Sequence, residues 1–218
     1  MLTHLLLLSI LTADPNADGF ALYKKGDYAK ALELFKKATK AEPKNQWAWL
    51  NHARVLAALN KGAEPEDYCA YEKNWVYLAL DSLERAVLLD SAKVQAKLAE
   101  PDVGTDLLKK RPEFQRWHVA ITAERDSDAQ LKKLLLAHPT WHSSPSGEIP
   151  KTLTLDAASK TWSVKNKQLE VTHEGKKRVL RPEVKPWAFN EGKMQFRTLL
   201  LEGEGSTWQL GAVIADCN

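Results

Sequence analysis

The sequence lacks the short motifs by which many enzymes are recognised. It contains no Gly-rich phosphate loop, no Cys-x-x-Cys pair, no His-Glu-x-x-His and no Gly-x-Ser-x-Gly. Its carboxylates are scattered, with no isolated pair in an apolar setting that would suit general acid–base catalysis. These absences predict a non-enzyme that needs no cofactor.

Cysteine is scarce and metal-ligand spacing is poor. Cys69 and Cys217 fit either an oxidising or a reducing compartment, and an exported chain could join them in one disulfide. His138 and His142 are four residues apart, but Pro139 lies between them in a segment that is typical of a linker. No metal site is therefore predicted.

Neither an excess of one charge nor a long apolar run is present. The 31 basic and 28 acidic residues give a formal net charge of +3, which is too even to predict a nucleic-acid partner. The basic strip 176–178 with Arg181 and Trp187 could serve single-stranded nucleic acid, but a charged hairpin edge that protects a small sheet is the stronger interpretation. No segment reaches the roughly 20 apolar residues of a spanning helix, so stable membrane insertion is not expected.

The N-terminus carries one short apolar run. Residues 5–11 are apolar except for Ser9, and Thr12-Ala13 could precede a cleavage site. The run is apolar on every side, whereas a packed surface helix should show a polar face. We therefore predict that residues 1–13 are a signal peptide and that the protein is exported, periplasmic or extracellular, in a bacterial-type setting. A first helix packed on the rest of a cytoplasmic protein is the alternative.

A helix-turn-helix pattern follows this run. Its members are Gly19, Leu22, Gly26-Asp27-Tyr28, Ala31, Phe35, Ala38 and Pro43. Small residues at Gly19 and Ala31 let two antiparallel helices approach closely, and Gly26 permits the turn between them. The pattern resembles the tetratricopeptide repeat, whose period is about 34 residues. The resemblance implies stacked helices that present a groove to a partner.

A second, less regular repeat begins at Gln46. Trp49, Ala53 and Leu56 occupy the expected positions, whereas His52 replaces the usual Leu. Its second helix is expected at 75–90, after an insert at 63–74 that is either a binding loop or a cap on the core. Short helices are then expected at 92–100, 106–110 (capped by Thr105), 112–124 and 126–137.

Beyond residue 150 the apolar period changes from about 3.6 to 2. Alternating pairs include Leu153 with Leu155, Trp162 with Val164, Leu169 with Val171, Trp187 with Phe189 and Met194 with Phe196. They predict an antiparallel meander of six or seven short strands that packs on the helices or curls into a small barrel. The predicted fold class is α+β: a helical domain at 14–137, a linker at 138–150 and a β-rich domain at 151–218.

The resemblance also implies that the first helix of each repeat lines the inner surface of the array. The inward positions are then Asn16, Phe20, Tyr23 and Lys24 in the first repeat, and Trp47, Leu50, Asn51 and Arg54 in the second. We predict a partner-binding site formed by Phe20, Tyr23, Lys24, Trp47, Asn51 and Arg54. Aromatic residues with two basic tips suit an extended peptide that bears apolar and acidic groups. One subgroup of the family grips a C-terminal carboxylate, but only Asn51 agrees with its pattern, so chaperone-tail binding is not expected.

The predicted function is non-catalytic binding of a protein or peptide, or scaffolding. One alternative is binding of an envelope polymer or carbohydrate by the Trp-rich β domain, which open aromatic residues on the sheet would favour. Another is an enzyme whose site lies at the domain junction, which a deep pocket with a perturbed carboxylate or His would favour. A third interpretation is that the short array curls on itself and the C-terminal sheet fills the groove, which leaves no open site there.

Overall fold

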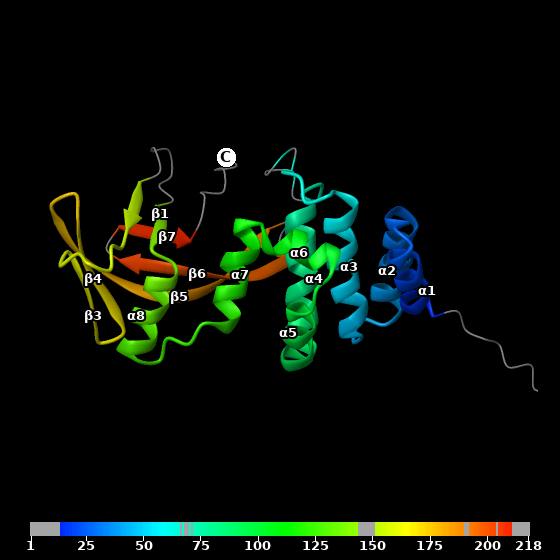
Figure 1. The fold of residues 1–218 in the computed structure, drawn as a ribbon, viewed down its shortest axis with the longest axis horizontal. Coiled ribbons are helices and arrows are strands. Elements are labelled where there is room, and N and C mark those ends of the chain that lie inside the picture. The colour runs from blue at the N-terminus through cyan, green and yellow to red at the C-terminus, as the bar shows by residue number, and fades with distance from the viewer. Residues whose placement is uncertain are drawn as a thin grey trace, which may run out of the picture.

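The computed structural model describes residues 14–65, 67, 70, 72–143, 151–189, 192–203 and 205–210. The predicted leader and both cysteines lie outside the described residues, so export and the disulfide stay predictions. Within the described ranges, helices precede a seven-stranded antiparallel sheet that curls into a half-barrel, which confirms the α+β class (Figure 1).

Eight helices occur in the described part of the chain: α1 (Pro15–Lys24), α2 (Tyr28–Ala41), α3 (Gln46–Leu59), α4 (Trp75–Leu89), α5 (Ser91–Ala99), α6 (Val103–Lys109), α7 (Pro112–Thr122) and α8 (Asp128–Ala137). The described strands are β1 (Thr140–Ser143), β2 (Thr152–Thr154), β3 (Trp162–Lys165), β4 (Gln168–His173), β5 (Lys176–Phe189), β6 (Met194–Gly203) and β7 (Ser206–Leu210).

Side-chain caps fix where the helices begin. The Asp14 carboxylate accepts hydrogen bonds from the backbone at the start of α1, and Asn45 and Asn74 do the same for α3 and α4. The prediction that Thr105 caps the short sixth helix was wrong. The helix begins earlier than predicted, at Val103, and Asp102 caps it by accepting from the Thr105 amide at 3.0 Å.

The first repeat packs as its small residues predict. A Cβ placed on Gly19 would lie 2.9 Å from the Phe35 ring, so only glycine lets α1 approach α2 this closely. Ala31 and Phe35 are fully buried at the contact. Gly26 has a φ of +79° and forms the turn between the two helices. The close helix pair of the predicted repeat is therefore present.

The sheet runs in the order β2-β1-β7-β6-β5-β4-β3. β1 lies inside the segment that was predicted as a linker, and it pairs with both β2 and β7. A 14-residue β5 replaces the short strand that alternation indicated only around Trp187 and Phe189. Pro182 and Pro186 are tolerated because, among the described strands, this half of β5 pairs with β6 alone and has one open edge.

The helices and the sheet meet where α4 and α7 pack on β6. Tyr77 and Phe196 place their rings 5.9 Å apart across this contact. The Glu84 carboxylate, buried at 5% exposure, accepts from Trp117 Nε1 at 2.7 Å and from Arg197 Nε at 2.6 Å. A buried carboxylate is tolerated when donors satisfy its oxygens. Glu84 thus joins α4, α7 and β6 through one side chain.

Further contacts extend the same junction along the sheet. Asp81 of α4 accepts from the Gln195 amide at 2.9 Å, and Arg85 donates to the Lys193 carbonyl at 3.0 Å. Arg116 of α7, itself buried, donates to the Leu210 carbonyl of β7 at 3.2 Å. These bonds give the helices and the sheet a shared polar interface around an apolar contact.

Glu84→Ala should therefore destabilise the whole protein. The change leaves the buried Trp117 N–H without its acceptor and Arg197 without its partner, so we expect a loss of about 2–3 kcal/mol in the free energy of unfolding. Urea denaturation followed by far-UV circular dichroism and by Trp fluorescence measures it. Glu33→Ala, an exposed carboxylate on α2, is the control and should change stability by less than about 0.5 kcal/mol. An unchanged midpoint for Glu84→Ala, or separate transitions from the two probes, would contradict the shared interface.

His52 should make stability depend on pH. Its Nδ1 lies 2.8 Å from Ser82 Oγ, which donates to the Leu78 carbonyl, and burial lowers the pKa of His52 to about 4. The unfolded chain takes up this proton near pH 6.5, whereas the folded chain does not until about pH 4. The free energy of unfolding should fall as the pH drops through this window. In His52→Leu the slope should decrease by up to about 1.4 kcal/mol per pH unit, and an unchanged slope would refute the assignment.

Candidate functional site

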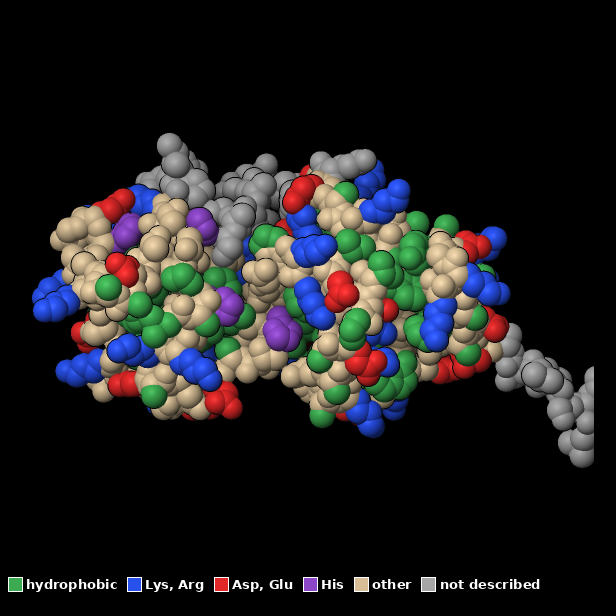
Figure 2. Space-filling view, in the orientation of Figure 1, with side chains coloured by type: hydrophobic (Ala, Val, Ile, Leu, Met, Phe, Trp, Pro, Cys, Tyr) green, Lys and Arg blue, Asp and Glu red, His purple; other side chains and the backbone are tan. Residues whose placement is uncertain are grey.

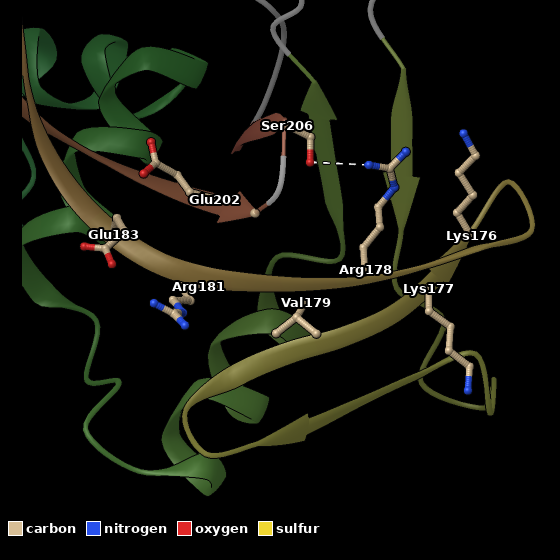
Figure 3. Close-up of a pocket in the computed structure, with 9 residues that line it drawn as sticks. Lys176, Lys177, Arg178, Val179, Arg181, Glu183, Glu202 and Ser206 are labelled. Carbon is tan, nitrogen blue, oxygen red and sulfur yellow. Dashed lines mark hydrogen bonds between the residues drawn. The ribbon is translucent and has the colours of Figure 1, made fainter.

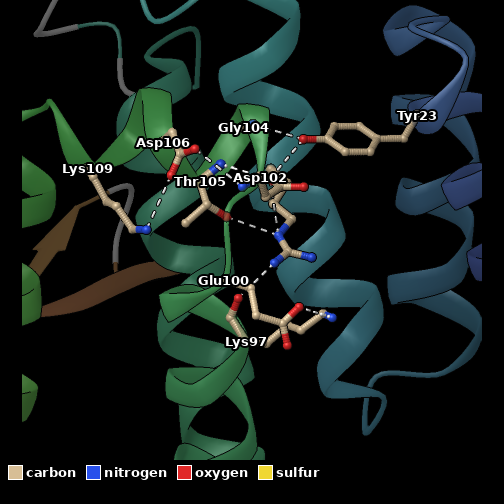
Figure 4. A network of polar contacts seen from close by, with 9 residues as sticks. Tyr23, Lys97, Glu100, Asp102, Gly104, Thr105, Asp106 and Lys109 are labelled. Carbon is tan, nitrogen blue, oxygen red and sulfur yellow. Dashed lines mark hydrogen bonds and ion pairs between the residues drawn. The ribbon is translucent and has the colours of Figure 1, made fainter.

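The inward face of α1 and α3 is partly covered by α6 of the same chain. A Cβ placed on Gly104 would lie 2.1 Å from the carbonyl oxygen of Arg54, so α6 touches the backbone of α3 directly. Only glycine permits this approach. The contact brings the first turn of α6 against two residues of the predicted site, Tyr23 and Arg54 (Figure 4).

A polar network fills this contact. The Tyr23 hydroxyl donates to Asp102 at 3.0 Å and accepts from the Gly104 amide at 2.9 Å. Arg54 Nε donates to Thr105 Oγ1 at 3.1 Å and lies 3.4 Å from the Asp102 carboxylate. Burial, and then the negative charge of Asp102, raise the pKa of the Tyr23 hydroxyl, which therefore remains a donor. The chain supplies its own acidic group to the predicted basic tip.

The six predicted site residues fall into two groups. Tyr23, Arg54 and Asn51 are buried, and Asn51 donates to Asn16 Oδ1 at 3.1 Å. Phe20 and Trp47 are half-buried and Lys24 is exposed. The Lys24 ammonium lies 4.8 Å from the centre of the Phe20 ring, within range of a cation–π contact. We call Phe20 and Lys24 on α1 the open end of the repeat face. Trp47 lies on α3 and packs against the main hydrophobic cluster.

The sequence analysis missed the residues of α6 that cover Tyr23 and Arg54. Residues 101–104 lay between two expected helices, and Asp102, Gly104 and Thr105 were not assigned to the groove. The sequence signal available was a glycine inside a short helix, which usually marks a close approach to another backbone. Within the described ranges, the segment that packs on this face is α6, a helix that follows the two repeats.

A separate hollow of about 430 Å³ lies between α5, α6 and α7, with His138 at its margin. Figure 2 shows histidine side chains near the middle of the molecule and others over the sheet. Burial lowers the pKa of His118 and of His138, which keeps both imidazoles neutral near pH 7. The hollow therefore has histidines with a perturbed pKa, as the enzyme alternative requires. Its described lining contains no carboxylate, serine or cysteine that could act with them.

The tryptophans of the second half belong mainly to the core. Trp117, Trp141 and Trp208 are at most 1% exposed. Trp162 and Trp187 are half-buried and pack against apolar clusters. A platform for stacking sugars needs open ring faces. The sheet thus gives little support to polymer binding.

Residues 22–66 match the family model of the tetratricopeptide repeat. The N-terminal region therefore contains a repeat of this family, while the C-terminal part matches no family model. Such repeats are typically non-catalytic and support a general role in protein interaction or scaffolding. Searches of curated proteins and of solved structures found no significant match. No helix within the described ranges is long and apolar enough to cross a membrane.

Tyr23→Phe tests whether the network holds α6 in place. Removing the hydroxyl leaves the Gly104 amide without its acceptor and takes one of several donors away from Asp102, so we expect a loss of about 1–2 kcal/mol in unfolding free energy. The matched control is Tyr28→Phe, a half-buried tyrosine with no described hydrogen bond from its hydroxyl, which should cost less than about 0.5 kcal/mol. Chemical denaturation measures both variants. Equal effects of the two changes would show that the Tyr23 hydroxyl does not anchor α6.

Proposed function

We propose that the protein is a non-catalytic scaffold that binds an extended acidic and apolar segment of a protein partner at the open end of the repeat face. The family match over residues 22–66 supports protein binding in general. The observation that carries the finer proposal is the pairing of Asp102 with Tyr23 and Arg54. It is an example, within the chain itself, of an acidic segment held on this face by an aromatic hydroxyl and a cation.

The open end also places a cation beside an aromatic ring, and no described residue of the chain occupies it. Phe20 stacks on Tyr23 with ring centres 6.2 Å apart, so the accessible aromatic surface continues directly from the filled part. Lys24 adds a positive charge above Phe20. Trp47 on α3 is half-buried against the main hydrophobic cluster and is not part of the open end. Aromatic residues and cations contribute most to binding energy at protein interfaces.

The amide pair beside these residues suits a peptide backbone. Asn51 donates to Asn16 Oδ1, which leaves other amide groups of Asn16 for a ligand because an amide side chain has both donors and acceptors. An extended peptide presents alternating N–H and C=O groups that such side chains can bind. Aromatic, cationic and amide groups therefore lie together on the accessible part of one face.

A peptide selection on the full chain tests the proposal. Random peptides displayed on phage and selected for binding should be enriched in acidic and large apolar residues. The double variant Phe20→Leu/Lys24→Ala, which keeps an apolar side chain against Tyr23, should weaken the best peptide by at least about tenfold, about 1.4 kcal/mol, with little change in the melting temperature. Fluorescence anisotropy of the labelled peptide measures the affinity.

The matched control is Leu88→Ala/Lys37→Ala, which removes an exposed apolar and an exposed basic residue elsewhere on the helices. It should leave the affinity within about twofold of the unchanged protein. Peptides that bind the control as poorly as the open-end variant, or that bind both variants fully, would place the interaction elsewhere and refute the proposal.

A further inference from the structure

A second and larger hollow, of about 800 Å³, lies where β5 changes its neighbour in the sheet. Lys176 to Leu180 pair with β4, and Arg181 onwards pair with β6. Gly203 and Ser206, next to the turn between β6 and β7, form the opposite wall. Among described strands only β4 pairs with the first part of β5, so one row of its backbone polar groups has no strand partner.

Four cations line this hollow within six residues: Lys176, Lys177, Arg178 and Arg181 (Figure 3). No described side chain forms an ion pair with any of them. Elsewhere on the protein, exposed lysines commonly pair with a carboxylate three or four residues away. The four cations therefore have no direct ion-pair partner among the described residues, and they outnumber the two carboxylates, Glu183 and Glu202, that line the same hollow.

Arg178 is the least satisfied of these groups. Its Nε is buried and has no hydrogen-bond partner, and its only described hydrogen bond is a long one of 3.5 Å from NH1 to Ser206 Oγ. Figure 3 shows its side chain reaching from β5 toward Ser206. A guanidinium that has unused donors and faces a hollow is suited to bind an anion there.

The carboxylates near the hollow do not neutralise it. Glu202 is held by Lys185 at 2.6 Å, and Glu174 by Lys151 at 2.9 Å. Glu183 remains on the wall beyond Arg181 and repels an anion from that end. An anion is therefore most stable over the stretch from Lys176 to Arg181.

We propose that this hollow binds a small molecule carrying a di- or triphosphate group. Side chains alternate along β5, so Lys176 and Arg178 project on the side of Ser206, and Lys177 and Arg181 project on the other side of the strand (Figure 3). The planar fork of Arg178 matches phosphate oxygens in pairs, and Lys176 on the same face supplies a point charge for a second phosphate. Lys177 and Arg181 add positive charge across the open strand edge, which favours a chain of phosphates over a single ion. The volume is in the range of ordinary small-molecule sites, and Val179, 48% exposed, gives an apolar contact for the organic part.

Calorimetric titration of the full chain with sodium triphosphate, at a constant ionic strength of roughly 0.15 M, tests this. Triphosphate should bind saturably and at least about tenfold more tightly than orthophosphate. Arg178→Gln should weaken triphosphate binding by about tenfold or more. If that variant melts lower than the unchanged protein, Lys176→Gln/Lys177→Gln, which alters two exposed side chains, should give the same loss.

The control is Lys165→Gln, which removes one exposed cation from β3, outside the hollow. It should leave the affinity for triphosphate within about twofold. Absence of saturable binding, or an equal loss in Lys165→Gln, would overturn the site. A single-stranded oligonucleotide that binds more tightly than triphosphate and depends on the same residues would also overturn the proposal, in favour of a nucleic-acid surface.

Discussion

The buried carboxylate of Glu84 is the constraint on which the rest of the structure depends. Two tetratricopeptide-like repeats leave an apolar helix face uncovered, and the half-barrel sheet has apolar faces of its own. Packing β6 on α4 and α7 covers both, but it also encloses Glu84. Trp117 and Arg197 make that burial tolerable by donating to its oxygens from different elements. The sheet is thus joined to the repeats by contacts that neither part could complete alone.

The inner face of the repeats is also partly covered by another part of the chain. A short array would normally leave its inner positions open to a ligand. Here α6 returns onto that face, and Gly104 lets it touch α3 at Arg54. The carboxylate of Asp102 then takes the place that an acidic ligand would take at Tyr23. The part of this face that stays accessible includes Phe20 and Lys24, an aromatic ring beside a cation.

Local pattern was sufficient to predict the repeat and the fold class. Gly19 and Ala31 predicted a close helix pair because small residues let two helices approach each other, and alternation predicted an antiparallel sheet. Burial of polar groups was harder to predict. Glu84 and Arg54 are charged residues, which usually lie on the surface, yet both are buried here. Their partners are distant in sequence and become known only from the fold. The long β5 was missed because Pro182 suits an edge strand but not a central one.

Native-state hydrogen exchange tests the central claim most directly. If the junction at Glu84 makes the helices and the sheet one cooperative unit, the slowest amides of α4, α7 and β6 should exchange with the same opening free energy, equal to that of global unfolding. They should also shift together when denaturant is added. Amides of β6 that open at a much lower free energy than those of α4 would show that the sheet unfolds separately, and would contradict the account.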